Sequence, residues 1–297
     1  MFKGVNSPVI TILKDDGSID YENMEKHINH LVDAGLNGLL FLGSLGEFYA
    51  FSETEKRALI DFAVKTAAGR TQVIIGIGNT EEEEVIRLAA HAAETGADAL
   101  NIVSPYYFGL PAAAAVEYFE RLTKAVGLPV MLYNFPDRTG SDLSPEIVRT
   151  IAQRCPTITG IKDTVDNISH TRRICQAVKP VRPDFSVLSG FDEYYIVNRI
   201  SGGDGVLCGL TNVVPELFVK MHASYESGDY AAALRCAEKI AGLMRIYTVT
   251  PLFITGMKAA VRAAGLSIST CTRAPGTPLT ETEDQEIRAI LADLEET

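Results

Sequence analysis

QVIIGIGNTEEEEVIRLAAHAAETGADALNIVS, residues 72–104, contains two short apolar runs with a helical pattern between them. The runs, 72–78 and 99–104, are continuous rather than alternating, which is typical of parallel strands that are covered by helices. The acidic run EEEE at 81–84 suits the first turn of a helix, where carboxylates interact favourably with the helix dipole. The stretch is therefore predicted to form a strand, a helix and a second strand parallel to the first.

The same unit recurs along most of the chain. Further apolar runs are found at 9–13, 38–43, 129–134, 158–163, 186–190 and 205–209, with helical patterns between them. Eight strand–helix units in series predict an α/β fold, a (β/α)8 TIM barrel, rather than a doubly wound sheet. A doubly wound sheet would carry a glycine fingerprint after its first strand, and neither GxGxxG nor GxxxxGKS/T occurs in the chain.

The strand-like runs stop at about residue 225. Three helical patterns follow, at 229–247, 251–265 and 280–296. We therefore predict a barrel domain, residues 1–224, which carries the active site, and a three-helix C-terminal extension, residues 225–297, which packs on the barrel.

Composition disfavours several classes of protein. The net charge of −11 provides no basic face for nucleic acid or an anionic membrane, so neither is an expected partner. No apolar run approaches the roughly 18 residues of a membrane helix, and no signal-peptide pattern is present, so we expect a cytoplasmic protein. Five scattered cysteines disfavour a disulfide framework or a zinc site. His27 and His30 would share a helix face without a third ligand, so we expect no metal.

Lys162 ends the apolar run 158–163, where a core position would normally be apolar. Active sites of TIM barrels lie at the C-terminal ends of the strands. Desolvation there disfavours the ammonium form, so the free amine becomes available for a Schiff base with a carbonyl substrate. The ordinary interpretation is a surface lysine, or one that is paired with Asp163.

Tyr133 and the segment GSLGE, residues 43–47, end two other predicted strands. The hydroxyl of Tyr133 would point into the same mouth, where it could act as a general acid/base near the amine. Its ordinary interpretation is a barrel aromatic residue. Ser44 and the amides that follow it form a turn that suits an anion such as a carboxylate.

Five segments together resemble those of one family. GSLGE (43–47), PYY (105–107), LYNFPDRTG (132–140), GIKDT (160–164) and SGFDE (189–193) are similar, in order and spacing, to the dihydrodipicolinate synthase/N-acetylneuraminate lyase family. The resemblance covers essentially the whole chain. It implies a class I aldolase or lyase on a (β/α)8 barrel with a helical extension, which uses a covalent imine and no metal or organic cofactor.

The resemblance also implies catalytic roles. Lys162 would form the Schiff base with pyruvate or a 2-oxo acid, and Tyr133 would move the proton at the imine and the aldol oxygen. Ser44 would link Tyr133 to Tyr107. In this family the second tyrosine reaches in from a neighbouring subunit, which implies a homo-oligomer, at least a dimer and usually a tetramer built as a dimer of dimers.

Four residues would bind the pyruvate half of the substrate. The amides of Ser44 and Leu45 would hold its carboxylate, and the backbone of Gly190 and Leu207 would close the pocket behind it. Leu45 departs from the family, whose synthases and sialic-acid lyases usually carry a hydroxyl residue there. Its absence costs about 0.5–1.5 kcal/mol if nothing replaces the hydrogen bond. Branches that act on 2-keto-3-deoxy sugar acids are looser at this position.

The residues expected to bind the second substrate point to different branches. Asp192, Glu193 and Thr164 resemble the residues with which lyases bind substrate hydroxyls, although the two acids could instead cap a helix. Arg138 resembles the arginine that receives the aldehyde's carboxylate in the synthases, and it could equally be a salt-bridging surface residue.

The favoured hypothesis is a class I aldolase that cleaves or forms a 2-keto-3-deoxy sugar acid, giving pyruvate and a hydroxyaldehyde. The alternative is 4-hydroxy-tetrahydrodipicolinate synthase, which condenses pyruvate with aspartate semialdehyde. A 2-keto-3-deoxy acid dehydratase would use the same lysine. A catalytically silent 2-oxo-acid-binding protein on the same barrel is a fourth hypothesis.

Overall fold

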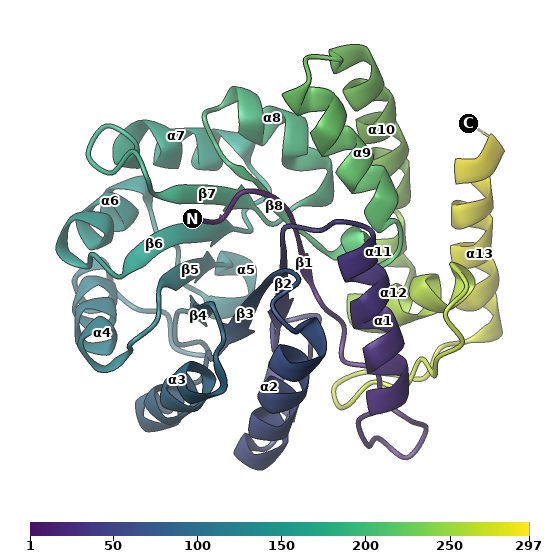
Figure 1. The fold of residues 1–297 in the computed structure, drawn as a ribbon, viewed down its shortest axis with the longest axis horizontal. Helices are drawn as coiled ribbons and strands as arrows, with labels where there is room; N and C mark the ends of the chain where they lie inside the picture. The colour runs from purple at the N-terminus through teal and green to yellow at the C-terminus, as the bar shows by residue number, and fades with distance from the viewer. Residues whose placement is uncertain (297) are drawn as a thin grey trace.

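A computed structural model describes residues 1–296 and contains a closed barrel of eight parallel strands. Each strand pairs with the next, and β8 pairs with β1 to close the barrel. Figure 1 shows the helices arranged around the strands, as predicted for a (β/α)8 barrel. The strands are β1 (Gly4–Pro8), β2 (Gly38–Phe41), β3 (Gln72–Gly76), β4 (Ala99–Val103), β5 (Val130–Asn134), β6 (Ile158–Asp163), β7 (Ser186–Ser189) and β8 (Gly205–Leu207).

Helices follow the strands, and one of them begins at Glu82, within the acidic run that was predicted to be a first turn. They are α1 (Tyr21–Asp33), α2 (Glu53–Ala67), α3 (Glu82–Thr95), α4 (Ala112–Ala125), α5 (Pro136–Thr139), α6 (Pro145–Arg154), α7 (Ile168–Val178), α8 (Tyr195–Ile200) and α9 (Pro215–Glu226). Short 3-10 helices occur at η1 (Phe48–Ala50), η2 (Asp192–Tyr194) and η3 (Gly209–Asn212). Helix α2 starts with a capping box between Ser52 and Glu55, which satisfies backbone amides that have no partner within the helix.

The first strand lies at Gly4–Pro8, so the prediction of a strand at 9–13 is wrong. All five residues of β1 are buried, including Asn6 and Ser7, whose side chains bond within the barrel. Because these residues are polar or lack strong strand propensity, they did not appear as an apolar run. The apolar residues at 9–13 are buried after the strand has ended.

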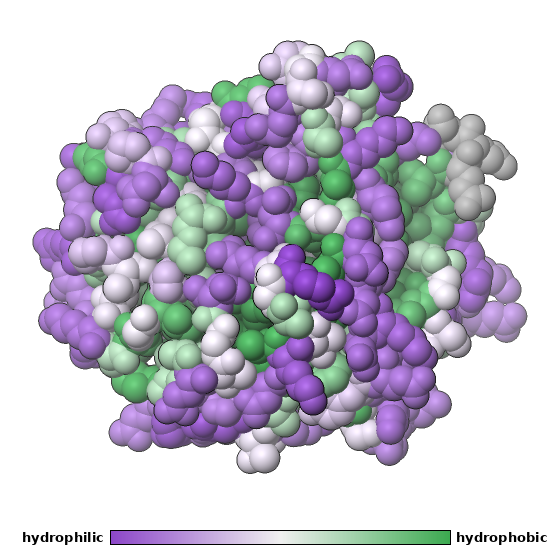
Figure 2. Space-filling model, viewed as in Figure 1, coloured by the Kyte–Doolittle hydropathy of each residue, from purple (hydrophilic) through white to green (hydrophobic). Residues whose placement is uncertain are grey.

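A layer of apolar side chains fills the barrel interior. It consists of Phe2, Leu40, Ile74, Ala99, Met131, Leu188 and Leu207, all fully buried. Phe2 is fixed there because its backbone N–H donates to the hydroxyl of Ser186, at the start of β7. The chain accordingly begins beside β6 and β7 (Figure 1). Polar residues cover much of the face seen in Figure 2, with hydrophobic residues visible between them.

The C-terminal extension contains the three predicted long helices and one short helix. They are α10 (Tyr230–Leu243), α11 (Ile246–Val249), α12 (Phe253–Ala263) and α13 (Glu281–Glu296), of which α11 is the short one. Helix α13 lies at the edge of the molecule, packed against α10 and α12 (Figure 1). The last barrel helix, α9, ends two residues beyond the predicted domain boundary, and the division into two domains stays a prediction. None of the described helices is long and apolar enough to cross a membrane.

Candidate active site

Lys162 and Tyr133 lie side by side at the C-terminal ends of β6 and β5. The strand register pairs the two residues directly, and the Lys162 Nζ atom lies 4.3 Å from the centroid of the Tyr133 ring. Both side chains are buried. Within residues 1–296 no carboxylate forms an ion pair with Lys162. The amine is therefore on a buried side chain and has no salt-bridge partner.

Asp163 does not pair with the preceding lysine. Its carboxylate accepts hydrogen bonds from Thr171 and Asn134 and contacts the imidazole of His170, which also lies 3.3 Å from Asp142. Burial by itself lowers the pKa of His170, but the two carboxylates outweigh burial and raise the pKa to about 9. At neutral pH the imidazolium is therefore charged, and this network anchors the end of β6.

The segment after β2 brings Ser44 to Tyr133. The hydroxyl oxygens of the two residues are 3.2 Å apart, which is hydrogen-bond distance. The segment folds back on itself because the Glu47 N–H donates to the Ser44 carbonyl and the Phe48 N–H donates to the Gly43 carbonyl. The contact between the Ser44 and Tyr133 hydroxyls is the first half of the predicted link from Tyr133 through Ser44 to Tyr107.

A cavity of about 440 Å³ lies at this end of the barrel. Most of the predicted site residues line it: Lys162, Tyr133, Ser44, Leu45, Arg138, Thr164, Gly190, Asp192 and Glu193. Its volume is in the range of small-molecule sites. The structure thus brings residues from β2, β5, β6 and β7 and their loops to one cavity.

Two predicted residues lie elsewhere in the structure. Leu207 belongs to the apolar layer inside the barrel, and the cavity is lined by the next two residues, Cys208 and Gly209. Tyr107 is 87% exposed, has a φ of 80°, and packs edge-on against Phe108. Within one chain Tyr107 therefore does not reach the cavity.

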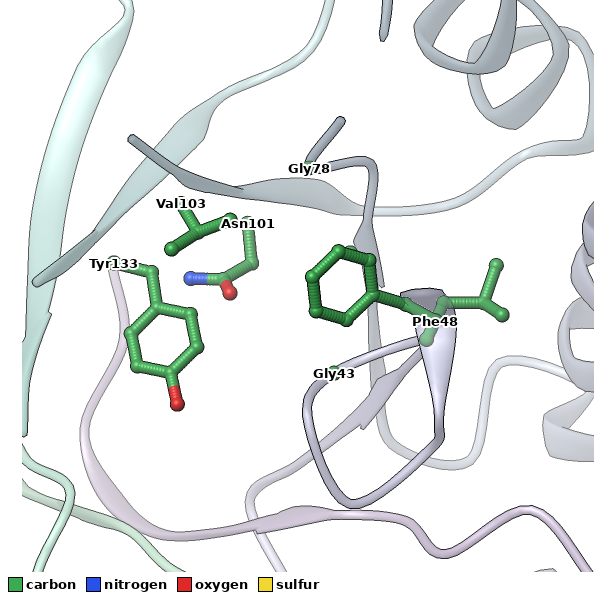
Figure 3. Close-up of a pocket in the computed structure, with 8 residues that line it drawn as sticks. Gly43, Phe48, Gly78, Asn101, Val103 and Tyr133 are labelled. Atoms are coloured by element: carbon green, nitrogen blue, oxygen red, sulfur yellow. The ribbon is translucent and has the colours of Figure 1, made fainter. Parts of the chain in front are cut away.

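A second, much smaller cavity of about 10 Å³ lies beside the ring of Tyr133. Figure 3 shows Asn101 next to this ring, Phe48 on the other side of the space, and the Tyr133 hydroxyl pointing away from Asn101. The space is about large enough for one water molecule. Since the hydroxyl points away from it, Tyr133 remains available to Ser44 and the large cavity.

Asp192 is buried in the cavity wall, and both of its carboxylate oxygens already accept hydrogen bonds. One oxygen accepts from the backbone N–H of Leu210 at 2.7 Å, and the other from the hydroxyl of Tyr247 at 2.7 Å. Burial raises the pKa of Asp192, which these hydrogen bonds oppose. Each oxygen of this carboxylate thus has a partner in the protein, and the binding of substrate hydroxyls by Asp192 stays a prediction.

Thr164 and Glu193 carry buried oxygen atoms without a hydrogen-bond partner among the described residues. These atoms are Thr164 Oγ1 and Glu193 Oε2. A side chain at Gly190 would overlap the Thr164 hydroxyl, so glycine leaves room for it. Burial, Asp192 and Asp166 all raise the pKa of Glu193. Both residues line the cavity, but these two atoms are themselves buried, so a ligand in the cavity reaches them only if the side chains move.

Arg138 lies between two aromatic rings at the edge of the cavity. Its guanidinium carbon is 5.8 Å from the centroid of Phe135 and 5.9 Å from that of Phe253. It forms no salt bridge with any described residue. Its side chain is exposed, as the alternative of a surface residue expects, although it has no salt-bridge partner among the described residues.

The extension supplies cavity residues that were missing from the sequence prediction. Met244, Tyr247, Thr248 and Phe253 all line the cavity; Met244 directly follows α10, and the others belong to α11 and α12. The helical patterns gave no sign of this role, because apolar and aromatic residues in amphipathic helices are usually core residues. The extension is thus one wall of the cavity.

No group of three potential metal ligands is found among residues 1–296, and all five cysteines are free. Burial raises the pKa of the Cys208 thiol well above its ordinary value, so it is a neutral part of the wall. The chemistry of the cavity therefore rests on an amine, hydroxyls and carboxylates.

Comparison with known proteins identifies similar chains along the full length. The model of the dihydrodipicolinate synthetase family matches residues 1–294. YagE of Escherichia coli K12, named as a candidate 2-dehydro-3-deoxy-D-gluconate aldolase, is 36% identical over 99% of this chain and 97% of its own. The crystal structure of YagE in complex with pyruvate has a TM-score of 0.97 and 36% identity, and the match covers 99% of both chains.

Two further relatives carry different names. YjhH of Escherichia coli K12, named as a candidate 2-dehydro-3-deoxy-D-pentonate aldolase, is 35% identical over 98% of this chain and 96% of its own. A 4-hydroxy-tetrahydrodipicolinate synthase of Kosmotoga olearia is 38% identical over 82% of this chain and 83% of its own.

Proposed function

Because the chain belongs to the dihydrodipicolinate synthetase family, we propose that it cleaves or forms a 2-keto-3-deoxy sugar acid as a class I aldolase. Members of this family are pyruvate-dependent lyases that form a Schiff base with a lysine and need no external cofactor. The products of cleavage would be pyruvate and a hydroxyaldehyde.

Lys162 would supply the amine. Its nitrogen attacks the C2 carbonyl of the keto acid, water leaves, and an iminium ion remains on the lysine. The iminium withdraws electrons as the C3–C4 bond breaks, which gives an enamine and the aldehyde. Protonation of the enamine at C3 and hydrolysis then release pyruvate and restore the amine. The buried position of Lys162 without a carboxylate partner supports this role.

Tyr133 would move the proton in the cleavage step. Its oxygen takes the proton from the C4 hydroxyl of the substrate as the aldehyde forms and passes its own hydroxyl proton to Ser44, which in turn releases a proton; the reverse direction returns it. The hydrogen-bond distance of 3.2 Å to Ser44 supports a proton path through these two hydroxyls.

The substrate class rests on one observation, the presence of a hydroxyl residue, Thr164, and a carboxylate residue, Glu193, among those that line the cavity. Residues of these types suit a polyhydroxy chain, because each substrate hydroxyl can donate and accept. Leu45 also lines the cavity where synthases would carry a hydroxyl. The names of YagE and YjhH agree with this substrate class.

The test is pyruvate release from 2-keto-3-deoxygluconate and 2-keto-3-deoxygalactonate, with the condensation of pyruvate and aspartate semialdehyde measured in parallel. Trapping of pyruvate on the protein by borohydride serves as the control for imine formation, and Lys162→Ala serves as the matched variant. Release without condensation is the expected result. Trapping without any turnover would instead favour a 2-oxo-acid-binding protein.

Arg138 favours a second candidate, 4-hydroxy-tetrahydrodipicolinate synthase. An unpaired guanidinium at the cavity edge is suited to the carboxylate of aspartate semialdehyde. Condensation without pyruvate release would support this function. Loss of water from the sugar acid, without pyruvate release, would instead support a dehydratase on the same lysine.

We further propose a cytoplasmic homo-oligomer in which Tyr107 of the partner subunit completes the site. Exposure of Tyr107 and Phe108 on a loop that does not reach its own cavity supports this arrangement. Sedimentation analysis gives the oligomeric state. The variant Tyr107→Phe should lower turnover and leave the oligomeric state unchanged. An active monomer would contradict this part of the proposal.

A further inference from the structure

A buried ion pair joins the extension to the segment that follows β2. The Nζ atom of Lys258 in α12 is 2.5 Å from Oε1 of Glu47, and both side chains are 0% exposed. Lys258 also donates to the carbonyl of Cys271 at 2.6 Å, and Oε2 of Glu47 accepts the backbone N–H of Arg273 at 2.7 Å. Other buried ion pairs of the described residues, such as Lys56–Glu84 and His170–Asp163, have at least one side chain that is partly exposed, whereas both side chains of this pair are completely buried.

Glu47 is attached to the loop that is proposed to hold the substrate carboxylate. It directly follows Ser44, Leu45 and Gly46, and its backbone N–H donates to the carbonyl of Ser44. Its φ of 55° lies in the left-handed region, which is unfavourable for glutamate and would suit glycine. A side chain is thus retained at a position where the backbone conformation favours its absence. Glycine would suit this backbone conformation better, so the presence of glutamate is explained by its carboxylate, which pairs with Lys258.

The same loop is held from two other directions. The hydroxyl of Thr11 donates to the carbonyl of Gly46 at 2.8 Å. Arg273 donates to both carboxylate oxygens of Glu55 and to the carbonyl of Ala50, and its guanidinium lies 4.3 Å from the centroid of the Phe51 ring. The loop is therefore fixed between the barrel and the extension, and the buried ion pair attaches to it three residues after Ser44.

We propose that Glu47 and Lys258 are positioning residues that hold the amides of Ser44 and Leu45 and the Ser44 hydroxyl in place for the keto acid. The inference rests on the proposed function of this cavity. Neither side chain lines the cavity, so the pair acts on the substrate only through the loop. The extension would then determine how well the barrel binds pyruvate.

A purely structural ion pair would give a different pattern of effects. Removing one partner leaves an unpaired buried charge and destabilises the protein, whereas removing both charges restores much of the stability. If the pair also positions the loop, the double variant remains defective in binding pyruvate although its stability has recovered. Stability and pyruvate binding are therefore the two quantities to separate.

The variants are Glu47→Gln, Lys258→Met and the double variant Glu47→Gln/Lys258→Met. The control is Lys179→Met, which breaks a half-buried ion pair with Asp204 at the opposite end of the barrel, at the start of β8. For each protein the melting temperature is measured, together with the pyruvate concentration that gives half-maximal borohydride trapping. The KM and kcat for pyruvate release are measured on the same samples.

In the double variant we expect a melting temperature near that of the wild type and a half-saturating pyruvate concentration raised by about 10–100-fold. This range corresponds to the loss of one hydrogen bond to a charged group. Lys179→Met should lower the melting temperature and leave trapping unchanged. If a single variant does not fold, the double variant still decides the question.

Wild-type trapping by the double variant, or equally weakened trapping by Lys179→Met, would overturn the inference. Failure of the wild-type protein itself to trap pyruvate would instead overturn the proposed function, so the two failures are distinguishable.

Discussion

Replacing Tyr247 by phenylalanine removes one buried hydroxyl group and leaves the ring that lines the cavity in place. The hydroxyl donates to Asp192 at 2.7 Å, and without it the carboxylate keeps the bond from the N–H of Leu210 and its interaction with the Cys208 thiol. A hydrogen bond to a charged group contributes about 1.5–3 kcal/mol. We therefore expect Tyr247→Phe to lower the free energy of unfolding by about this amount.

The corresponding change in melting temperature follows from the size of the chain. At about 2.1 cal/mol/K per residue, the 297 residues give an unfolding entropy of roughly 0.6 kcal/mol/K. The loss of 1.5–3 kcal/mol then lowers the melting temperature by about 2–5 °C. Circular dichroism during heating measures this shift, with all variants at one protein concentration.

Tyr118→Phe is the matched control, because its hydroxyl is also buried but has no hydrogen-bond partner among the described residues. Removing an unsatisfied polar group should leave the melting temperature unchanged or raise it. An unchanged melting temperature in Tyr247→Phe, together with an altered KM for the sugar acid, would refute the reasoning. Asp192 would then be a free ligand for substrate hydroxyls, as the sequence predicted.

Three further predictions concern Lys162, Tyr133 and His170, which lie at or beside the ends of β5 and β6. Lys162→Ala should abolish both borohydride trapping of pyruvate and turnover, with an unchanged circular dichroism spectrum; retained turnover would contradict the imine mechanism. Tyr133→Phe should still trap pyruvate but lower kcat by about 10²–10⁴, the usual effect of a positioned acid/base, and an unchanged kcat would remove it from the proton path. The pKa of His170 is raised from 6.5 to about 9 in the folded protein, so its contribution to stability is complete below pH 6.5 and is lost as pH rises through about 9. The difference in melting temperature between wild type and His170→Gln should therefore shrink above pH 9, and a constant difference would exclude this role.

The barrel and its mouth were predictable because both depend on local patterns. Continuous apolar runs at βα spacing indicate parallel strands, and residues at strand ends must meet at one edge of the barrel. Lys162 and Tyr133 followed from this rule, and the strand register confirms that they lie opposite each other. The strand β1 was misplaced because its polar residues, Asn6 and Ser7, are buried with the help of partners about 200 residues away, which the local pattern does not reveal.

The walls of the cavity were less predictable because they depend on contacts between distant segments. Tyr247 and Asp192 are 55 residues apart, and nothing in the pattern at 229–247 reveals the break before α11 that brings the tyrosine to the cavity. The hydrogen-bond partners of Asp192 were not predictable for the same reason, since they belong to other elements. Residue type identified the carboxylate, whereas the fold decides whether it is free.

The pairing of Glu47 with Lys258 also orders events during protein synthesis. The ribosome adds Glu47 211 residues before Lys258, an interval of roughly 10–40 s at about 5–20 residues per second. Throughout this time the carboxylate has no cation with which to be buried, so it stays hydrated. The loop therefore makes this contact with the extension only after Lys258 has been added. A chain released early, before Lys258, would carry Lys162 and Tyr133 but would lack this contact between the loop and the extension.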